Sequence, residues 1–325
     1  MVRIIFITSL VMILAGCQAQ IKTTSTLPLP TVEAIPTNPA RPTLATTPIP
    51  SATIKAPIPR FSHIAVIVFE NKEFSSVIGN KKMPNFNRLA QEFTLLTQHY
   101  AIRHPSLPNY IAMIGGDTFG IDHTCVDCFI NATSLPDLIE TAGLTWKTYQ
   151  EHMPAPCHKQ DTLRYFQKHN PFIYFDSIRL DQARCESSVV PLTTLDEDIL
   201  TGGLPNFIFI TPDICNDAHD CGLDVADAWL QPWVDKLMAD PDFTRDGLII
   251  LTWDEGQGDH SCCGLPTGGG RIATVLISPL VKNGFEDATP YTHYSLLRTI
   301  SESWGLPLLG HAADGETNLI TAPWK

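Results

Sequence analysis

The sequence has few basic residues for its length. Its 325 residues include 22 lysines and arginines against 34 aspartates and glutamates, which gives a formal net charge of −12. An acidic chain repels nucleic acid and anionic lipid surfaces, so a polyanion-binding role is not expected. A small phosphate ester remains a candidate ligand, because a bound cation can reverse the field locally.

An apolar run long enough to cross a bilayer is missing from the N-terminal segment. The run at residues 4–15 is too short for a membrane-spanning helix, and it ends in Leu14-Ala15-Gly16-Cys17. Small residues before a cysteine resemble the lipobox of bacterial lipoproteins. We therefore predict a signal peptide over residues 1–17, lipidation of Cys17, and an extracytoplasmic lipoprotein anchored at the cell surface or in the periplasm. An ordinary signal peptide with a chance cysteine is the alternative.

Aromatic residues are absent from residues 18–59, which are rich in threonine, proline and alanine. Such a composition cannot bury a hydrophobic core. We predict a disordered linker over residues 18–60 and a globular domain over residues 61–325.

The cysteine count is compatible with disulfide bonds. If Cys17 is lipidated, eight cysteines remain, and an even number in an exported chain favours disulfides whose pairing the sequence leaves open. The eight are Cys125, Cys128, Cys157, Cys185, Cys215, Cys221, Cys262 and Cys263. The alternative is a zinc site built from Cys125, Cys128 and the Cys262-Cys263 pair.

Four apolar, β-branched runs predict buried strands. They lie at residues 63–69, 207–210, 248–253 and 272–277. Helix-like segments lie between or after them, at residues 83–93, 134–142, 225–239 and 294–304. Alternation of strands and helices predicts an α/β fold, a three-layer sandwich around a mainly parallel sheet.

Oxygen-bearing side chains follow two of these strands. Glu70 and Asn71 follow the first, and Asp254 and Glu255 follow the third. Ligands of open α/β sheets bind at the carboxyl ends of strands, so these four side chains are expected to converge. Three carboxylates held together repel one another unless a cation neutralises them, and an all-oxygen set suits Mg²⁺, Ca²⁺ or Mn²⁺. A helix N-cap at Glu70-Asn71 and a solvated loop at Asp254-Glu255 are the alternatives.

Ser106 and His219 are candidates for chemistry. Ser106 precedes an apolar, helix-compatible stretch, so it is either a helix N-cap or a nucleophile at a helix N-terminus. His219 stands in an acidic loop after the second strand, between Asp217 and Asp220. A histidine there suits protonation of a leaving oxygen or contact with a phosphate oxygen.

Five segments, taken in order, resemble one family. They are Phe69-Glu70-Asn71-Lys72-Glu73-Phe74, His104-Pro105-Ser106-Leu107-Pro108-Asn109-Tyr110, Asn216-Asp217-Ala218-His219-Asp220, Leu251-Thr252-Trp253-Asp254-Glu255 and Tyr291-Thr292-His293-Tyr294-Ser295-Leu296-Leu297-Arg298. The ordered set is similar to the bacterial phosphoesterase family of acid phosphatases and phospholipases C, in the alkaline phosphatase superfamily. The resemblance covers roughly residues 61–310 and implies an alkaline-phosphatase-like fold.

The resemblance also implies residue roles. Glu70, Asn71, Asp254 and Glu255 would hold a divalent metal ion, with Zn²⁺ open beside Mg²⁺, Ca²⁺ and Mn²⁺. Ser106 would be the nucleophile of a phosphoserine intermediate, and His219 with Asp217 would contact phosphate or donate a proton. His104 and His293 would bind substrate. The segment 259–263 has no clear counterpart in the family.

The expected activity is hydrolysis of phosphate monoesters, as in acid phosphatases. A phospholipase C acting on lipid phosphodiesters is the nearest alternative, and small phosphate esters or phospholipids are the expected substrates. A non-enzymatic substrate-binding lipoprotein of a transporter is the alternative of another class, because it would share the anchor and the linker without needing a nucleophile.

Overall fold

The computed structural model describes residues 57–262 and 268–325, and all of them belong to one compact unit. The predicted signal peptide, Cys17, most of the predicted linker and Cys263 lie outside the described residues. The packed part begins before residue 61, because Ile58 is buried in the core. Within the described ranges, no helix is long and apolar enough to cross a membrane.

A nine-stranded mixed sheet forms the middle of the unit. The strand order is β4-β3-β5-β1-β6-β7-β2-β8, and β9 also pairs with β2. The bounds are β1 Ile64–Phe69, β2 Thr94–Tyr100, β3 Trp146–Gln150, β4 Val189–Pro191, β5 Phe207–Thr211, β6 Leu248–Trp253, β7 Arg271–Ile277, β8 Phe285–Asp287 and β9 Tyr291–Thr292.

The half of the sheet that carries the candidate site is parallel. Strands β4, β3, β5, β1 and β6 pair parallel to one another, whereas β7 is antiparallel to both β6 and β2. All six residues of β1 and of β6 are buried, because helices cover both faces of these strands. The segments that follow β5, β1 and β6 therefore emerge side by side at one edge.

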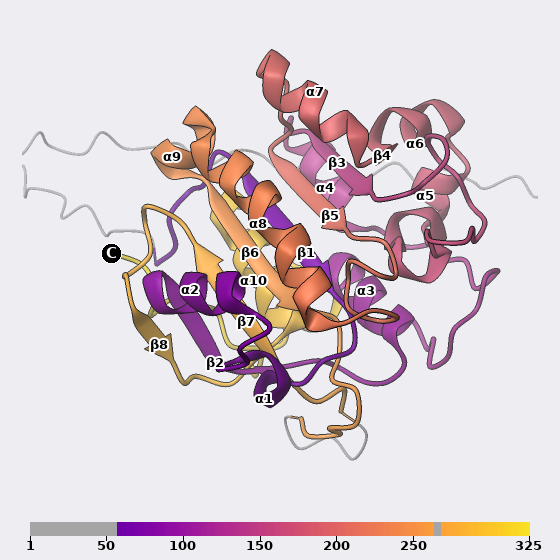
Figure 1. Cartoon of the computed structure of the whole chain (residues 1–325). Helices are drawn as coiled ribbons and strands as arrows, with labels where there is room; N and C mark the ends of the chain where they lie inside the picture. The colour runs from indigo at the N-terminus through magenta and orange to yellow at the C-terminus, as the bar shows by residue number, and fades with distance from the viewer. Residues whose placement is uncertain (1–56, 263–267) are drawn as a thin grey trace, which may run out of the picture. The chain divides into compact units, whose positions relative to one another are not determined.

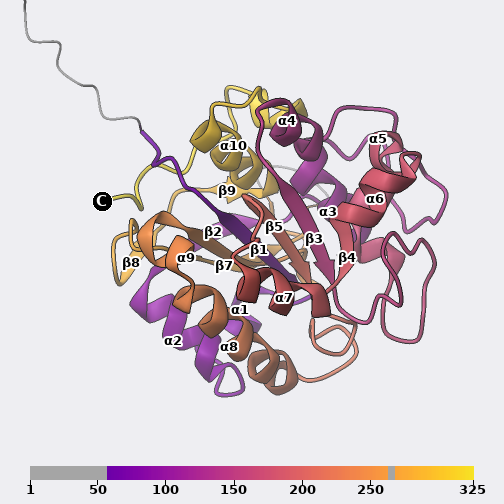
Figure 2. The same cartoon turned by 90° about the horizontal axis from the view of Figure 1, so that it is seen from above.

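Helices cover the sheet on both faces, and Figure 2 shows the resulting three layers. One face packs against α3 (Ser106–Gly115), α4 (Leu135–Thr141), α5 (Asp176–Arg179), α6 (Gln182–Ser188), α10 (His293–Trp304) and the 3₁₀ helix η2 (Pro171–Tyr174). The other packs against α1 (Phe74–Val77), α2 (Pro84–Glu92), α7 (Thr193–Thr201), α8 (Leu223–Ala239) and α9 (Pro241–Asp246), of which α2 and α8 lie in front of the sheet in Figure 1. The short 3₁₀ helices η1 (Gln167–His169) and η3 (Gly310–Ala313) lie in connecting segments.

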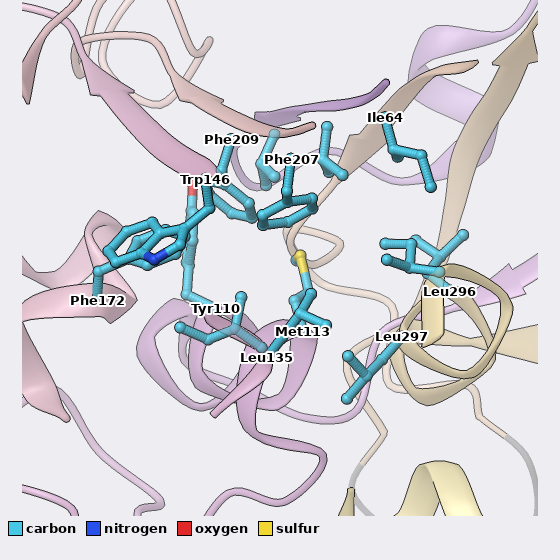
Figure 3. Close-up of a cluster of buried hydrophobic side chains, with 14 of the residues drawn as sticks. Ile64, Tyr110, Met113, Leu135, Trp146, Phe172, Phe207, Phe209, Leu296 and Leu297 are labelled. Atoms are coloured by element: carbon cyan, nitrogen blue, oxygen red, sulfur yellow. The ribbon is translucent and has the colours of Figure 1, made fainter. Parts of the chain in front are cut away.

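Alternation along β1 divides the hydrophobic core into two halves. Ile64, Val66 and Val68 face the side that includes α3 and α10, and their neighbours in the strand face α2 and α8. Figure 3 shows the first half, where Phe207 and Phe209 of β5 meet Met113 of α3. In the same cluster the rings of Trp146 and Phe172 stack with centroids 5.2 Å apart.

The predicted α/β three-layer architecture is confirmed. The four predicted strands correspond to β1, β5, β6 and β7, and the four predicted helices to α2, α4, α8 and α10. Strands β2 and β3 were not predicted, because polar residues interrupt the apolar pattern of their sequences. In β3, Thr148 and Gln150 are buried, and the Gln150 amide donates hydrogen bonds to the hydroxyls of Thr148 and Thr211.

Between described cysteines, three disulfides join Cys125 to Cys128, Cys157 to Cys185, and Cys215 to Cys221. The prediction of disulfides is therefore confirmed for these six cysteines. The alternative of a zinc site at Cys125 and Cys128 is wrong, because each sulfur is already bonded to the other and cannot act as a thiolate ligand.

The central strand β6 offers a test of the core. Ile250 is 1% exposed and pairs in register with Val66. We expect Ile250→Ala to lower the free energy of unfolding by about 2–5 kcal/mol, through lost burial and the cavity left behind. Leu200→Ala is the control, since Leu200 is 86% exposed and its truncation should change stability by less than about 0.5 kcal/mol. Urea unfolding of both variants measures the difference, and equal losses would contradict this description of the core.

Candidate active site

Three carboxylates meet where β1 and β6 end. Phe69 and Trp253 are partners in the parallel register, so Glu70 and Asp254 follow at the same level of the sheet and Glu255 comes next. One ligand oxygen from each of the three carboxylates lies within 4.8 Å of the others. Glu70 and Asp254 are fully buried, and Glu255 is 4% exposed.

The hydroxyl of Ser106 points into this group. Ser106 is the first residue of α3, and its Oγ lies 3.0 Å from Glu70 Oε2 and 3.1 Å from Glu255 Oε1. Pro105, not Ser106, occupies the N-cap position, and no side-chain cap is made there. The N-cap interpretation of Ser106 is therefore wrong: its one hydroxyl proton is donated to Glu70 or to Glu255, and the side chain does not cap the helix.

Asn71 is held beside the three carboxylates by its backbone. Its φ of 61° lies in the left-handed region, which asparagine tolerates better than most residues. The turn lets the Asn71 N–H donate to Asp254 Oδ1 at 2.9 Å. The alternative of a helix N-cap at Glu70-Asn71 is wrong, because the next helix, α1, begins at Phe74 with Glu73 as its N-cap.

Burial and mutual repulsion set the charge of the cluster. Burial, with the neighbouring Glu70 and Glu255 carboxylates, raises the pKa of Asp254 well above its usual value. Burial also raises the pKa of Glu255, although the contact with His104 opposes the shift. Full ionisation of all three carboxylates is therefore disfavoured unless a positive charge compensates it.

A divalent cation fits this arrangement. Asp254 Oδ2 is buried and has no hydrogen-bond partner among the described residues, although a buried carboxylate oxygen costs free energy when it is unpaired. Three carboxylate oxygens, with a hydroxyl beside them, form the kind of donor set that hard cations prefer. Glu70, Asp254 and Glu255 could thus hold a metal ion.

His169 belongs to the site, and the sequence analysis did not identify it. It ends η1, is 2% exposed, and places Nε2 2.5 Å from Glu70 Oε1 and Nδ1 3.5 Å from Asp217 Oδ2. Burial lowers the pKa of His169 although the Glu70 carboxylate opposes this, which favours a neutral ring. For Glu70, burial raises the pKa, but the contact with His169 outweighs it and the net shift is downward.

Nothing in the local sequence distinguishes His169. It follows a lysine in an irregular segment, far in sequence from any of the predicted strands. The only available signal would have been the unusual burial of a histidine, which the sequence does not show.

Asp217 and His219 lie on the other side of Glu70, after β5. The Glu70 N–H donates to the Asp217 carbonyl at 2.9 Å, and the Asp217 carboxylate accepts from the His219 N–H at 2.7 Å. Burial and the Glu70 charge raise the pKa of Asp217. The His219 side chain is 29% exposed, with Nδ1 2.7 Å from Asp220 Oδ1 and its ring 6.4 Å from the ring of His169.

His104 and His293 contact the cluster in different ways. His104 Nδ1 lies 2.6 Å from Glu255 Oε2, and this contact raises the pKa of His104. His293 is fully buried, and its Nε2 lies 2.7 Å from the backbone oxygen of Asp254. Burial lowers the pKa of His293 to about 4, so the ring is neutral at neutral pH and Nε2 donates to this carbonyl.

A buried asparagine fixes the segment that leads to Ser106. The Asn109 side chain accepts from the N–H groups of Ile102 and Arg103 at 2.9 and 3.2 Å and donates to the oxygens of Arg103 and Pro105 at 2.7 and 3.3 Å. Four bonds from one fully buried amide set the path of the backbone just before the serine.

A second acidic group lies near the end of β3 and β5 but differs from the first. It consists of Glu151, His152 and Asp213. Asp213 already pairs with Arg164 and His152 at 2.7 and 2.6 Å, and Glu151 accepts from Asn216 at 2.9 Å. Because these carboxylates have partners, they do not need a cation as Asp254 does.

Comparison with known proteins assigns this geometry to a family. The model of the phosphoesterase family matches residues 80–307, which include Ser106, Asp217, His219, Asp254 and Glu255. The chain belongs to the phosphoesterase family. Glu70 and Asn71 precede the matched stretch, and the pairing of β1 with β6 brings them to it.

Curated relatives support the same assignment. A phosphate-repressible acid phosphatase of Penicillium chrysogenum is 36% identical over 263 residues, which is 77% of this chain and 60% of that protein. A phosphatidylinositol-3-phosphatase of Mycobacterium tuberculosis is 31% identical over 271 residues, covering 82% of this chain and 84% of that protein. A hemolytic phospholipase C of Pseudomonas aeruginosa is 23% identical over 292 residues, 69% of this chain and 39% of that protein. The chain thus spans less than two thirds of the acid phosphatase it matches.

Solved structures confirm the fold. A protein of the alkaline phosphatase superfamily from Vibrio parahaemolyticus superposes with a TM-score of 0.55 at 13% identity, over 79% of this chain and 71% of that one. The alkaline-phosphatase-like architecture expected of the family is therefore present.

The role of Asn109 can be tested against a matched asparagine. Asn87 bonds backbone groups in the same manner, accepting from the Gly79 N–H at 2.6 Å and donating to the oxygen of Met83 at 2.8 Å, but it belongs to α2. We expect Asn109→Ala and Asn87→Ala each to lower the free energy of unfolding by about 1–3 kcal/mol. Only Asn109→Ala should weaken binding of a divalent cation, measured by calorimetry on the folded variants. Equal cation affinity in the two variants would show that Asn109 does not position the site.

Proposed function

We propose that this protein is a metal-dependent phosphoesterase that hydrolyses phosphate monoesters through a phosphoserine intermediate, as expected for an acid phosphatase. One observation carries the proposal: the Ser106 hydroxyl is held between the carboxylates of Glu70 and Glu255, in a cluster with an excess of negative charge. A serine placed there for structure alone would not require three buried carboxylates around it.

The metal ligands in this proposal are Glu70, Asn71, Asp254 and Glu255. The three carboxylates and the orphan oxygen of Asp254 support them. The oxygen-rich set favours Mg²⁺, Ca²⁺ or Mn²⁺ over Zn²⁺. When bound, a divalent ion would neutralise the cluster and lower the pKa of a nearby hydroxyl.

Ser106 is the proposed nucleophile. Its Oγ would form a bond to phosphorus while the bond from phosphorus to the ester oxygen breaks. The hydroxyl proton would pass to a carboxylate, and Glu255, whose pKa is raised, lies 3.1 Å away. The N-terminus of α3 begins at Ser106, so the helix dipole would favour the transferred phosphoryl group at this position. Water would then cleave the bond from phosphorus to Oγ.

His219 is the proposed proton donor to the leaving oxygen. Its Nδ1 is engaged by Asp220, so Nε2 can face a substrate, and the ring is partly exposed. The Asp217 carboxylate accepts a hydrogen bond from the His219 N–H and lies 3.5 Å from Nδ1 of His169. His104 is proposed to contact the substrate, because its side chain is 23% exposed and already lies on Glu255.

We assign His293 a positioning role in place of direct substrate contact. It is fully buried, and its hydrogen bond to the Asp254 carbonyl fixes the backbone from which that carboxylate projects. His169 is proposed to do the same for Glu70, since carboxylates engage both of its ring nitrogens.

The proposed substrates are small phosphate esters or the phosphorylated headgroups of lipids. The names of the relatives support both classes of substrate. One relative is a phosphatidylinositol-3-phosphatase, whereas the name of the acid phosphatase mentions no lipid. A phospholipase C activity remains the second candidate, supported by one distant relative. A non-enzymatic substrate-binding lipoprotein has no use for the Ser106 arrangement.

We further propose an extracytoplasmic location with a lipid anchor at Cys17, a signal peptide over residues 1–17 and a linker to residue 60. The three disulfides favour an oxidising compartment. The anchor rests on the Leu14-Ala15-Gly16-Cys17 segment.

Substitution of the nucleophile tests the chemistry. Ser106→Ala is expected to lower kcat for p-nitrophenyl phosphate by at least about 10³-fold, because no phosphoserine can form. Ser278→Ala is the matched control, since both serines are 3% exposed and Ser278 only accepts a backbone N–H from Leu280. Its kcat should stay within about twofold of the parent. Turnover by Ser106→Ala near that of Ser278→Ala would exclude the proposed mechanism.

Removal of a carboxylate tests the metal site. In metal-free protein at neutral pH, Asp254→Asn should raise the free energy of unfolding by about 1 kcal/mol or more, because it removes a carboxyl group whose pKa the fold raises and whose ionisation the fold therefore disfavours. The same variant should lose the rise in melting temperature that added Mg²⁺ or Mn²⁺ gives the parent.

Asp213→Asn, in the second acidic group, is the control for this experiment. It removes a carboxylate that Arg164 and His152 satisfy, so it should destabilise the metal-free protein and keep the response to the cation. If Asp213→Asn abolished the response to the cation and Asp254→Asn kept it, the metal site would have to be assigned to the second acidic group.

A further inference from the structure

Exposed apolar side chains gather in one part of the sequence. Among the described residues, six large hydrophobic side chains are exposed, and four of them fall between residues 126 and 180. These four are Val126 (59% exposed), Phe129 (45%), Leu163 (91%) and Leu180 (67%), and we refer to them as the apolar rim. Isolated apolar residues on a surface need no explanation, but a group on neighbouring loops does.

The loops that carry the apolar rim are tied together. Val126 stands inside the turn closed by the Cys125–Cys128 disulfide. The Gln167 side chain donates to the Val126 oxygen at 2.9 Å, and the Tyr174 hydroxyl donates to the Cys125 oxygen at 2.8 Å. Figures 1 and 2 both show this part of the chain on the side of the molecule that carries α5 and α6.

Two further contacts extend the apolar rim. Leu163 lies in a tight turn in which the Thr162 N–H donates to the Tyr165 oxygen at 2.8 Å. Phe129 packs under the guanidinium of Arg179, 3.6 Å from the ring centroid, and Leu180 is the next residue. Internal bonds hold both turns, so the exposed apolar groups are presented by ordered backbone.

The apolar rim borders the candidate active site. Arg164, next to Leu163, pairs with Asp213 at the end of β5, and Gln167, which holds the Val126 loop, begins the η1 helix that ends at His169. The apolar groups therefore stand on segments that also supply residues beside Glu70 and Asp213, and contacts made by the rim would bring a surface close to the site.

The charges near the apolar rim suit phosphate groups. Lys159 and Lys168 lie in the same segments, and the Lys159 ammonium donates to the backbone oxygen of Arg179 at 2.7 Å. Lys168 directly precedes His169, whose ring contacts Glu70 and Asp217, so Lys168 belongs to a segment that reaches the site. Asp127 and Asp161 in these loops offset the two lysines, so attraction to anionic surfaces alone is weak and the apolar contacts must dominate.

We propose that the apolar rim inserts into the surface of a phospholipid bilayer and presents lipid-borne phosphate esters to Ser106. Separate apolar tips on two ordered loops suit a fluid interface, into which each tip can insert independently. The Lys168 ammonium would meet headgroup phosphates at the level of that interface. The substrate part of this inference rests on the proposed function, whereas binding of the bilayer does not.

Vesicle binding tests the proposal with the full chain carrying Cys17→Ser, so that no acyl anchor contributes. Phosphatidylcholine vesicles with one fifth phosphatidylinositol are the probe, and co-sedimentation is the measurement. The combined variant Val126→Ser with Leu163→Ser should bind at least about tenfold more weakly, because each substitution removes an apolar side chain from the interface. Its turnover of soluble p-nitrophenyl phosphate should remain that of the parent.

Leu200→Ser is the matched control, since Leu200 is as exposed as the residues of the apolar rim but lies on α7. It should bind vesicles like the parent. Absence of vesicle binding by the parent, or equal loss in the control, would overturn the proposal, and so would a rim-dependent dimer in sedimentation without vesicle binding. If the parent binds vesicles through the rim but hydrolyses no phosphate ester, the docking surface stands and the proposed function fails.

Discussion

The repulsion between three buried carboxylates is the constraint on which the rest of the site depends. Glu70, Asp254 and Glu255 converge because β1 and β6 are neighbours and end at the same level, so the sheet itself imposes the crowding. Burial removes the water that would screen their charges, and Asp254 keeps one oxygen without a partner. A fold that maintains such a group at the end of its most buried strands does so at a cost in stability, which is the basis for proposing a cation site beside the Ser106 hydroxyl.

Partners placed around the carboxylates hold them in position. His169 lies on Glu70, His104 lies on Glu255, and His293 donates to the backbone of Asp254, so each carboxylate residue has its own histidine. The three histidines differ in exposure: His104 is 23% exposed by side chain, whereas His169 and His293 are buried. This difference in exposure supports a role in substrate contact for His104 and a role in orienting the carboxylates for His169 and His293.

The segment before Ser106 shows how a loop can be as well defined as a strand. Asn109 bonds four backbone groups from within α3, and Gly269 lies so close that a Cβ on it would stand 2.6 Å from the Arg103 oxygen. A side chain at position 269 would push the Arg103 backbone, and with it His104 and Ser106, away from the carboxylates. The glycines of the 268–270 segment therefore serve close backbone packing beside the site.

The sequence by itself determined the α/β class, the four strands β1, β5, β6 and β7, and the carboxylates at strand ends, because continuous apolar runs and the polar residues that end them are local patterns. The sequence did not decide whether Ser106 caps a helix or acts as a nucleophile. Only the distances from its Oγ to Glu70 and Glu255 distinguish these two roles. Strands β2 and β3 and the role of His169 were decided by the tertiary structure alone. In β3, buried hydrogen bonds compensate polar residues that break the pattern, and His169 gains its partners from segments roughly 50 to 100 residues away. Burial and long-range contact are properties of the packed chain, and no short stretch of sequence encodes them.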